Sequence, residues 1–333
     1  GLLSAGGAAA LPTIATAASA QAAGTSPYGS LDGIDPDENG VILPAGFTSR
    51  VVAVAGEPVG DTDHLWHIFP DGAATFADGE GGWYHTVNSE VFNEGLGRVG
   101  AIHYDADGEI IDAYPILEGS RDNCAGGPTP WGTWLSCEER FNGPGLVWEC
   151  DPTGQNDAVA RPAMGLFSHE AVAVDPVSET LYMTEDDFTA GVLYRFTPTA
   201  YPDLSEGTLE AAIVADDGSV TWGVIDDPAG DPVRTNAQVE GATQFIGGEG
   251  IWYHDGWIYF CTKSDNKVHA IDLRNQRYET IYEANPDDVE AGTAVLSGVD
   301  NITVDAGTGD LFVAEDGGNM EVVIITPEGE VAP

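Results

Sequence analysis

The sequence predicts an all-β protein built as a β-propeller. Short apolar runs separated by turn residues recur from about residue 40 to the end of the 333-residue chain, and no segment has a convincing 3.6-residue amphipathic period. The 43 glycines and 20 prolines supply turn residues, and a hydrophobic content of 42% is enough to bury a sizeable core. A strand unit that repeats about every 40 to 50 residues is typical of propeller blades.

The repeated unit consists of an acidic residue, a strand, a tight turn, a second strand that ends in another charged residue, and a third strand. Three copies begin at Glu170, Glu249 and Asp300. A more degenerate copy covers residues 124–149, and a fifth is expected at residues 67–90. Because the innermost strand of every propeller blade lines one central channel, residues at equivalent positions of the repeat are expected to meet there.

The first position of the unit holds Cys124, Glu170, Glu249 and Asp300. A single acid at the start of a strand is most often a turn residue, but three acids and a thiol in register form a set. Converging carboxylates repel each other and raise each other's pKa unless a cation lies among them. Oxygen ligands suit calcium, and the added thiolate favours a transition metal such as iron.

The other three cysteines, Cys137, Cys150 and Cys261, lie inside apolar strand runs. This placement favours small buried hydrophobic side chains. The four cysteines are compatible with disulfides outside the cell, and their spacing matches no zinc motif. Metal ligation is one reason for a free thiol in an exported protein.

The chain has 55 acidic residues against 11 basic ones, a net charge of -44, and its lysines are Lys263 and Lys267. Nucleic acid is not expected as a partner, because binding it requires Lys and Arg to neutralise phosphates. Most of the acids are interpreted as a solvated surface, which repels itself unless counterions screen it. A minority would bind divalent or trivalent cations.

Residues 1–25 contain a weakly apolar, Gly- and Ala-rich stretch followed by small residues, which is typical of an export signal remnant. The low hydrophobicity of this stretch suits the twin-arginine route, and the stretch is too short and too Gly/Ala-rich for a membrane span. We therefore expect residues 26–333 to form a single propeller domain, exported to the periplasm, the cell surface or the medium. An integral membrane protein is not expected.

The run NCAGGPTPWGTWLSCEE at residues 123–139 has an unusual composition and resembles the signature of the PhoX-type alkaline phosphatases. Further matches follow in the expected order, namely FSHEAV at 167–172, GGEGIWY at 247–253, VDNI at 299–302 and AEDGG at 314–318. Together the matches span roughly residues 60 to 330.

The resemblance implies an exported six-bladed propeller that hydrolyses phosphate monoesters at a calcium and iron (Ca²⁺ and Fe³⁺) cluster in its central funnel. Relatives continue beyond the position of Pro333 with another strand pair, so we expect either a sequence that is incomplete at both ends, with a propeller incomplete at the C-terminus, or an unusual closure of the propeller. In such a site the cations bridge the phosphate oxygens, neutralise developing charge and position the nucleophile, so no side chain need act as a covalent nucleophile.

By the same resemblance, Cys124 is the iron-binding thiolate. The implied carboxylate ligands are Glu139, Glu170, Glu249, Asp300 and Glu315. Weaker candidates are Glu90 and Glu185, and Glu138 could exchange roles with Glu139. His169, next to Glu170 in the chain, would orient that ligand by hydrogen bonding.

One position departs from the family pattern. Family members carry an arginine that holds phosphate two residues before the glutamate equivalent to Glu249, whereas this chain has Gly247. Lys263 would supply the missing positive charge and contact the phosphate of a small phosphorylated substrate. The alternative for Lys263 is a strand-end lysine in solvent.

Two other functions stay open at this point. One is a different metal-dependent hydrolase on the same fold, such as a calcium-dependent lactonase or a phosphodiesterase. The other is a non-catalytic calcium-binding propeller that serves as a surface or interaction protein. The oligomeric state does not follow from the sequence.

Overall fold

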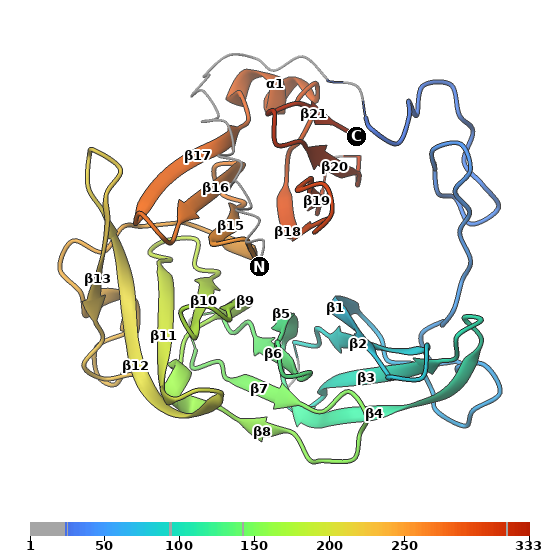
Figure 1. Ribbon diagram of the computed structural model, residues 1–333, viewed down its shortest axis with the longest axis horizontal. Coiled ribbons are helices and arrows are strands. Elements are labelled where there is room, and N and C mark those ends of the chain that lie inside the picture. Colours follow the sequence, from blue (N-terminus) through green and yellow to red (C-terminus); the bar gives the residue numbers. More distant parts are fainter. Residues whose placement is uncertain (1–23, 25, 93–94, 142, 318) are drawn as a thin grey trace, which may run out of the picture.

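The computed structural model describes residues 24, 26–92, 95–141, 143–317 and 319–333. The predicted export signal at residues 1–25 therefore falls almost entirely outside the described residues. Within the described ranges the chain forms five antiparallel sheets around one axis, and each sheet uses consecutive strands (Figure 1). The prediction of an all-β propeller is confirmed.

The first sheet contains β1 (Pro70–Ala77), β2 (Trp83–Ser89), β3 (Gly97–Tyr104) and β4 (Ile110–Ser120). The second contains β5 (Asn123–Pro128), β6 (Trp134–Glu138), β7 (Val147–Cys150) and β8 (Val159–Ala160). The third contains β9 (His169–Asp175), β10 (Thr180–Glu185), β11 (Leu193–Ala200), β12 (Asp203–Val214) and β13 (Val220–Val224). The fourth contains β14 (Gly248–His254), β15 (Trp257–Thr262), β16 (Lys267–Asp272) and β17 (Arg277–Glu283). The fifth contains β18 (Val299–Val304), β19 (Leu311–Glu315), β20 (Val322–Ile325) and β21 (Val331–Ala332).

The prediction of about six blades is wrong, because the described residues form five sheets. The described segment before β1 consists of turns and one isolated bridge, between Pro58 and Leu65. Its positive-φ glycines, at positions 29, 33, 40, 46, 56 and 60, interrupt any extended strand. In Figure 1 this blue segment passes between the fifth and first sheets.

Innermost strands of the sheets border a cavity of about 770 Å³. It is lined by residues of β1, β5, β14 and β18, among others.

Helical structure is sparse in the described residues. The one α-helix there, α1 (Pro286–Ala291), begins at the N-cap Asn285, whose side chain accepts a hydrogen bond from the Asp287 amide. Two short 3₁₀ turns, η1 (Pro162–Met164) and η2 (Thr235–Ala237), lie in connections between strands. No helix among the described residues is long and apolar enough to cross a membrane.

Apolar side chains fill the space between neighbouring sheets. One cluster joins the second and third sheets through residues such as Leu135 and Tyr194, and another joins the fourth and fifth through residues such as Val268 and Val313. Strand alternation places these side chains on the faces that the sheets turn toward each other. The core is therefore a series of apolar layers between sheets.

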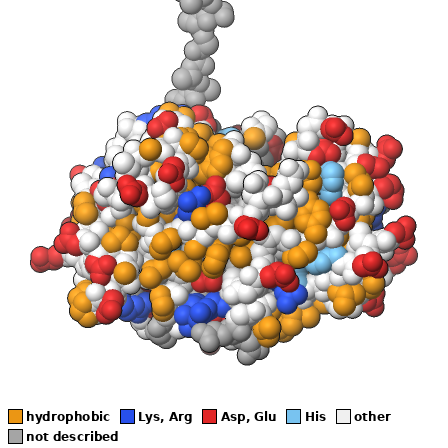
Figure 2. All heavy atoms as spheres, turned by 90° about the horizontal axis from the view of Figure 1, so that it is seen from below, with side chains coloured by type: hydrophobic (Ala, Val, Ile, Leu, Met, Phe, Trp, Pro, Cys, Tyr) orange, Lys and Arg blue, Asp and Glu red, His pale blue; other side chains and the backbone are white. Residues whose placement is uncertain are grey.

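The three cysteines expected to be buried, Cys137, Cys150 and Cys261, lie in these layers, fully buried and with free thiols. That prediction is confirmed. The fourth cysteine, Cys124, is also free but is only partly buried. Figure 2 shows acidic side chains spread around the outline of one side of the molecule, with few basic ones between them.

The innermost strands β1, β5, β9, β14 and β18 share one irregularity near their beginnings. In each of them two residues lie opposite a single residue of the next strand, as in a β-bulge. The bulged pairs are residues 71–72, 124–125, 170–171, 249–250 and 300–301. A bulge re-aims side chains that would otherwise alternate between the two faces of the sheet. The first residue of every pair is an acid or Cys124.

The second residue of each bulge is small or of moderate size, because neighbouring innermost strands approach closely there. A Cβ on Gly72 would lie 2.5 Å from the Cα of Ala125, and a Cβ on Gly250 would lie 2.6 Å from the Cα of Asn301. Both neighbours are backbone atoms that cannot rotate away. These two glycines let β1 approach β5, and β14 approach β18.

We expect Gly250→Ala to destabilise the protein by about 1–3 kcal/mol, the range typical of overpacking, because β14 and β18 must move apart. The free energy of unfolding in urea measures this. Gly143→Ala is the matched control, since its nearest neighbour is the flexible side chain of Arg140 at 3.3 Å. Equal stabilities of the two variants would contradict the close-approach argument.

Candidate metal centre

The first residues of the five bulges lie together with neighbouring acids at one end of the ring. Three groups of residues could each hold a metal ion, because within each group the donor atoms lie within 4.8 Å of one another. They are Asp71, Glu90 and Cys124, then Cys124, Glu139 and Glu170, and finally Glu170, Glu249 and Asp300. Because the groups share Cys124 and Glu170, they form one continuous set, which we call the acidic cluster.

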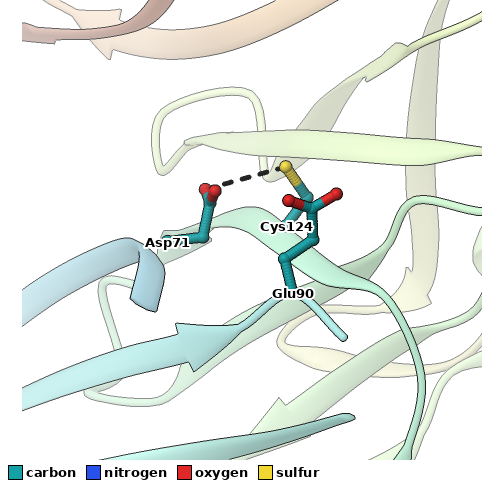
Figure 3. A group of neighbouring side chains, drawn as sticks. All are labelled: Asp71, Glu90 and Cys124. Carbon is teal, nitrogen blue, oxygen red and sulfur yellow. Dashed lines mark hydrogen bonds between the residues drawn. The ribbon is translucent and has the colours of Figure 1, made fainter. Parts of the chain in front are cut away.

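Cys124 lies in the middle of the acidic cluster. Its Sγ is 3.6 Å from Oδ1 of Asp71 and 3.4 Å from Oε1 of Glu170. Figure 3 shows Asp71 of β1 and Glu90, which directly follows β2, beside Cys124 of β5. The thiol is thus the point at which donors from three sheets meet.

A second set of charged residues faces the same end of the ring. It consists of the residue that directly follows the second strand of each sheet, namely Glu90, Glu139, Asp186, Lys263 and Asp316. Glu139 Oε1 and Asp186 Oδ1 are buried and have no hydrogen-bond partner among the described residues. A buried oxygen without a donor is costly unless a cation or water contacts it.

The electrostatics of the acidic cluster are those of like charges in a poorly hydrated space. Burial and the carboxylate of Glu249 raise the pKa of Glu170 well above its ordinary value. Burial and Asp300 do the same to the pKa of Glu249, and burial and Glu170 raise the pKa of the Cys124 thiol. Without a cation these groups favour their protonated forms. A metal ion would hold them deprotonated, so the donor set fits a metal.

Lys263 directly follows β15 and lies beside the acidic cluster, with its side chain 25% exposed. Its Nζ is 2.9 Å from Oδ2 of Asp300, 2.6 Å from Oδ2 of Asp316 and 3.9 Å from Oε1 of Glu249. Burial opposes its charge, but the neighbouring Glu249 and Asp300 raise its pKa above the ordinary value. Lys263 is therefore a permanent cation beside the acidic cluster.

Gly247 cannot be replaced by a larger residue without local strain. Its φ is +67°, and a Cβ there would lie 2.7 Å from Oγ of Ser264. The carbonyl of Gly247 accepts a hydrogen bond of 2.8 Å from the amide of Lys263. The backbone conformation of Gly247 therefore positions the loop that carries Lys263.

Three of the glutamates predicted as ligands accept hydrogen bonds from nearby loops and side chains. They are Glu138, Glu185 and Glu315. Glu138 accepts hydrogen bonds from the amide of Leu146 and the indole of Trp148. Glu315 accepts them from the amides of Ser297 and Glu321.

Glu185 is held by the hydroxyl of Tyr194, the side-chain amide of Asn236 and the amide of Val192. Arg234 bonds Asp187 at 2.6 Å and lies 3.5 Å from Glu185. Burial raises the pKa of Glu185 to about 8.

The glutamates that bond to loops and the charged residues that face the acidic cluster differ by one position at the end of the second strand. The structure aligns Glu138, Glu185, Thr262 and Glu315, whereas Lys263 aligns with Glu139, Asp186 and Asp316. Because strand side chains alternate, a one-residue shift moves a side chain to the opposite face. Lys263 therefore corresponds to Glu139, Asp186 and Asp316 in the repeat, and Thr262 corresponds to Glu185 and Glu315.

His169 does not orient Glu170. Its Nε2 lies 3.0 Å from the carbonyl oxygen of Gly165, and its ring packs on Phe167 with centroids 3.6 Å apart. The ring is fully buried and belongs to the first residue of β9. Strand alternation separates it from the cluster face, so this histidine supports the loop.

Two polar residues opposite the bulges support the cluster from behind. Asn88 donates to the carbonyls of Cys124 and Ala125, and it accepts from Trp134 and Ser136. Thr184 donates from its hydroxyl to the carbonyl of Glu249 at 2.6 Å. Each residue ties a bulge in the next sheet to its own sheet, which restricts the positions of the ligands.

Sequence reasoning missed three acids of this end of the ring, Asp71, Asp186 and Asp316. Asp71 is the second residue of β1, as Cys124 is of β5 and Glu170 of β9. The fifth repeat was expected at residues 67–90, so alignment of its first strand would have identified Asp71. Asp186 and Asp316 could be identified only from the correct register of the second strands.

Comparison with known proteins shows the fold and the family of this chain. A family model described as alkaline phosphatase PhoX matches residues 106–146 and 142–333. Pseudomonas fluorescens PhoX, solved in complex with vanadate, a transition state analogue, has a TM-score of 0.71 at 17% identity, over 87% of this chain and 86% of that chain.

A gluconolactonase from Xanthomonas campestris reaches a TM-score of 0.44 at 14% identity, over 79% of this chain and 74% of that chain. No curated protein matches the sequence. Because the family model matches more than half of its length, this chain belongs to the PhoX alkaline phosphatase family.

Proposed function

We propose that the protein is an exported metal-dependent phosphatase that hydrolyses phosphate monoesters at the acidic cluster. The observation that carries the proposal is the convergence of four carboxylates and one thiol from the five bulges, at one end of the ring. Family membership supports the reaction class. The vanadate bound by the Pseudomonas fluorescens protein is consistent with phosphoryl transfer in a relative of the same fold.

The donor types indicate which residues would hold which ion. Cys124, Glu139 and Glu170 would hold iron, since this group includes a thiolate. The all-oxygen group of Glu170, Glu249 and Asp300 would hold calcium. Bound cations would supply charge neutralisation for the transferred phosphoryl group.

Lys263 takes the role of the phosphate-binding cation. It is paired to Asp300 and Asp316 at hydrogen-bond distance and is only partly exposed. An ammonium group so placed can donate to a phosphate oxygen at the cluster, as a compact point charge. It also offsets part of the repulsion among the acids.

Cys124→Ser should lose iron and lower phosphatase activity by about 100-fold or more, above the 10- to 100-fold typical of residues that only support ligands. Metal analysis of purified protein and hydrolysis of 4-nitrophenyl phosphate measure both effects. Cys150→Ala, a buried cysteine away from the acidic cluster, should keep iron and activity. An unchanged iron content in Cys124→Ser would rule out thiolate ligation.

Lys263→Met should raise KM for a phosphate monoester by about tenfold, because one charge-assisted hydrogen bond to phosphate is lost. Lys263→Arg should recover part of this loss. Lys267→Met is the control, since that lysine pairs with Asp265 and Glu283 at 3.1 and 3.4 Å outside the acidic cluster. Equal KM values for both Met variants would refute the phosphate role.

The metal-depleted protein should lose stability as pH rises. Burial and neighbouring acids raise the pKa of Glu170, Glu249 and Glu139 in the folded state. Groups with raised folded pKa values stabilise the fold below their unfolded pKa of about 4.5, and this contribution is lost as pH rises through the folded values. Thermal unfolding of chelated protein at about pH 5 and pH 9 tests this, with a smaller change expected after reconstitution. A higher melting temperature at pH 9 than at pH 5 in the chelated protein would contradict it.

A further inference from the structure

Four of the five loops between second and third strands carry a large exposed apolar side chain. Phe92 is 64% exposed, Phe141 50%, Phe188 56% and Met320 68%. We call these four residues the apolar rim. In the remaining loop, between β15 and β16, the chain places Lys263 and Asp265 instead.

The apolar rim lies at the same end of the ring as the acidic cluster. Phe92, Phe141 and Phe188 each follow by two residues an acid that faces the funnel, Glu90, Glu139 and Asp186 respectively. Single exposed apolar residues need no explanation. Here, in contrast, four equivalent loops around one site each carry a large apolar residue, and this repetition calls for an explanation.

Two members of the rim contact each other across different sheets. The rings of Phe141, from the second sheet, and Phe188, from the third, stack with centroids 6.0 Å apart and an interplanar angle of 18°. The acids next to them, Glu139 and Asp186, influence each other's pKa. The stacked rings therefore belong to the two loops that carry Glu139 and Asp186, whose buried Oε1 and Oδ1 atoms have no hydrogen-bond partner among the described residues.

We infer that the apolar rim selects the alcohol part of the substrate, favouring phosphate monoesters of aromatic or bulky apolar alcohols. This inference rests on the proposed phosphatase function. When the phosphoryl group lies at the acidic cluster, the ester oxygen leads outward past the rim. An aromatic group there covers exposed ring surface of Phe141 and Phe188, which is favourable in water. A small polar alcohol such as glycerol gains nothing from the same contact.

The test uses metal-loaded full-length protein and two substrates, 2-naphthyl phosphate and glycerol 2-phosphate. The double variant Phe141→Ser/Phe188→Ser should lower kcat/KM for the naphthyl ester about tenfold and leave the glycerol ester within about twofold. Val177→Ser is the control, since Val177 is 84% exposed on the turn between β9 and β10. Equal loss on both esters, or no loss on either, overturns the inference.

A binding measurement separates this inference from the proposed function. Calorimetry should show phenylphosphonate binding about tenfold more tightly than methylphosphonate to the wild type, with the preference lost in the double variant. Preferential binding without turnover of any ester would support the rim and sink the phosphatase function. Turnover of both esters without preference would support the phosphatase and sink the rim. Absence of both binding and turnover overturns both.

The rim could instead cover a second copy of the chain. Sedimentation of the wild type and the double variant distinguishes this case. A wild-type dimer that becomes monomeric in the double variant, with substrate preference unchanged, would assign the rim to self-association and overturn the inference. A monomer in both, together with the lost preference, supports it.

Discussion

Repulsion among carboxylates that the fold forces together is the constraint on which the rest of this structure depends. Five bulged strands bring Asp71, Cys124, Glu170, Glu249 and Asp300 to one end of the ring. Burial and mutual repulsion raise the pKa of Glu170 and Glu249. Since buried like charges are unfavourable without compensation, the fold and a set of cations are expected to stabilise each other.

The backbone around the acidic cluster is built for close approach. Gly72 and Gly250 allow neighbouring innermost strands to touch. Asn88 and Thr184 then bond across sheets to the carbonyls of the bulges. Ligand position is therefore determined by backbone contacts between blades and not by the ligands themselves. Such preorganisation is what the proposed metal site requires.

In the three repeats whose second strand ends in a glutamate, that glutamate and the acid that follows it have different roles. The last residue of the second strand, as in Glu138 and Glu315, accepts loop amides and fixes the turn. The residue after it, as in Glu139 and Asp316, faces the funnel. One added positive charge, Lys263, at this second position makes the ring asymmetric. Phosphate recognition by a lysine on one side and apolar contact on the other would give the funnel a direction.

The sequence by itself determined the all-β class, the repeat, and Cys124, Glu170, Glu249 and Asp300 as residues that meet, because these follow from local patterns and repeat equivalence. It also identified the family through continuous motifs. Only the tertiary structure decided the number of sheets, since strand formation before β1 depends on backbone conformation at dispersed glycines. It also placed Glu139 in the acidic cluster, and it gave Glu138 and Glu315 hydrogen bonds to loop groups. A bulge changes strand register by one residue, and pairing with a distant segment, which local sequence does not encode, sets that register.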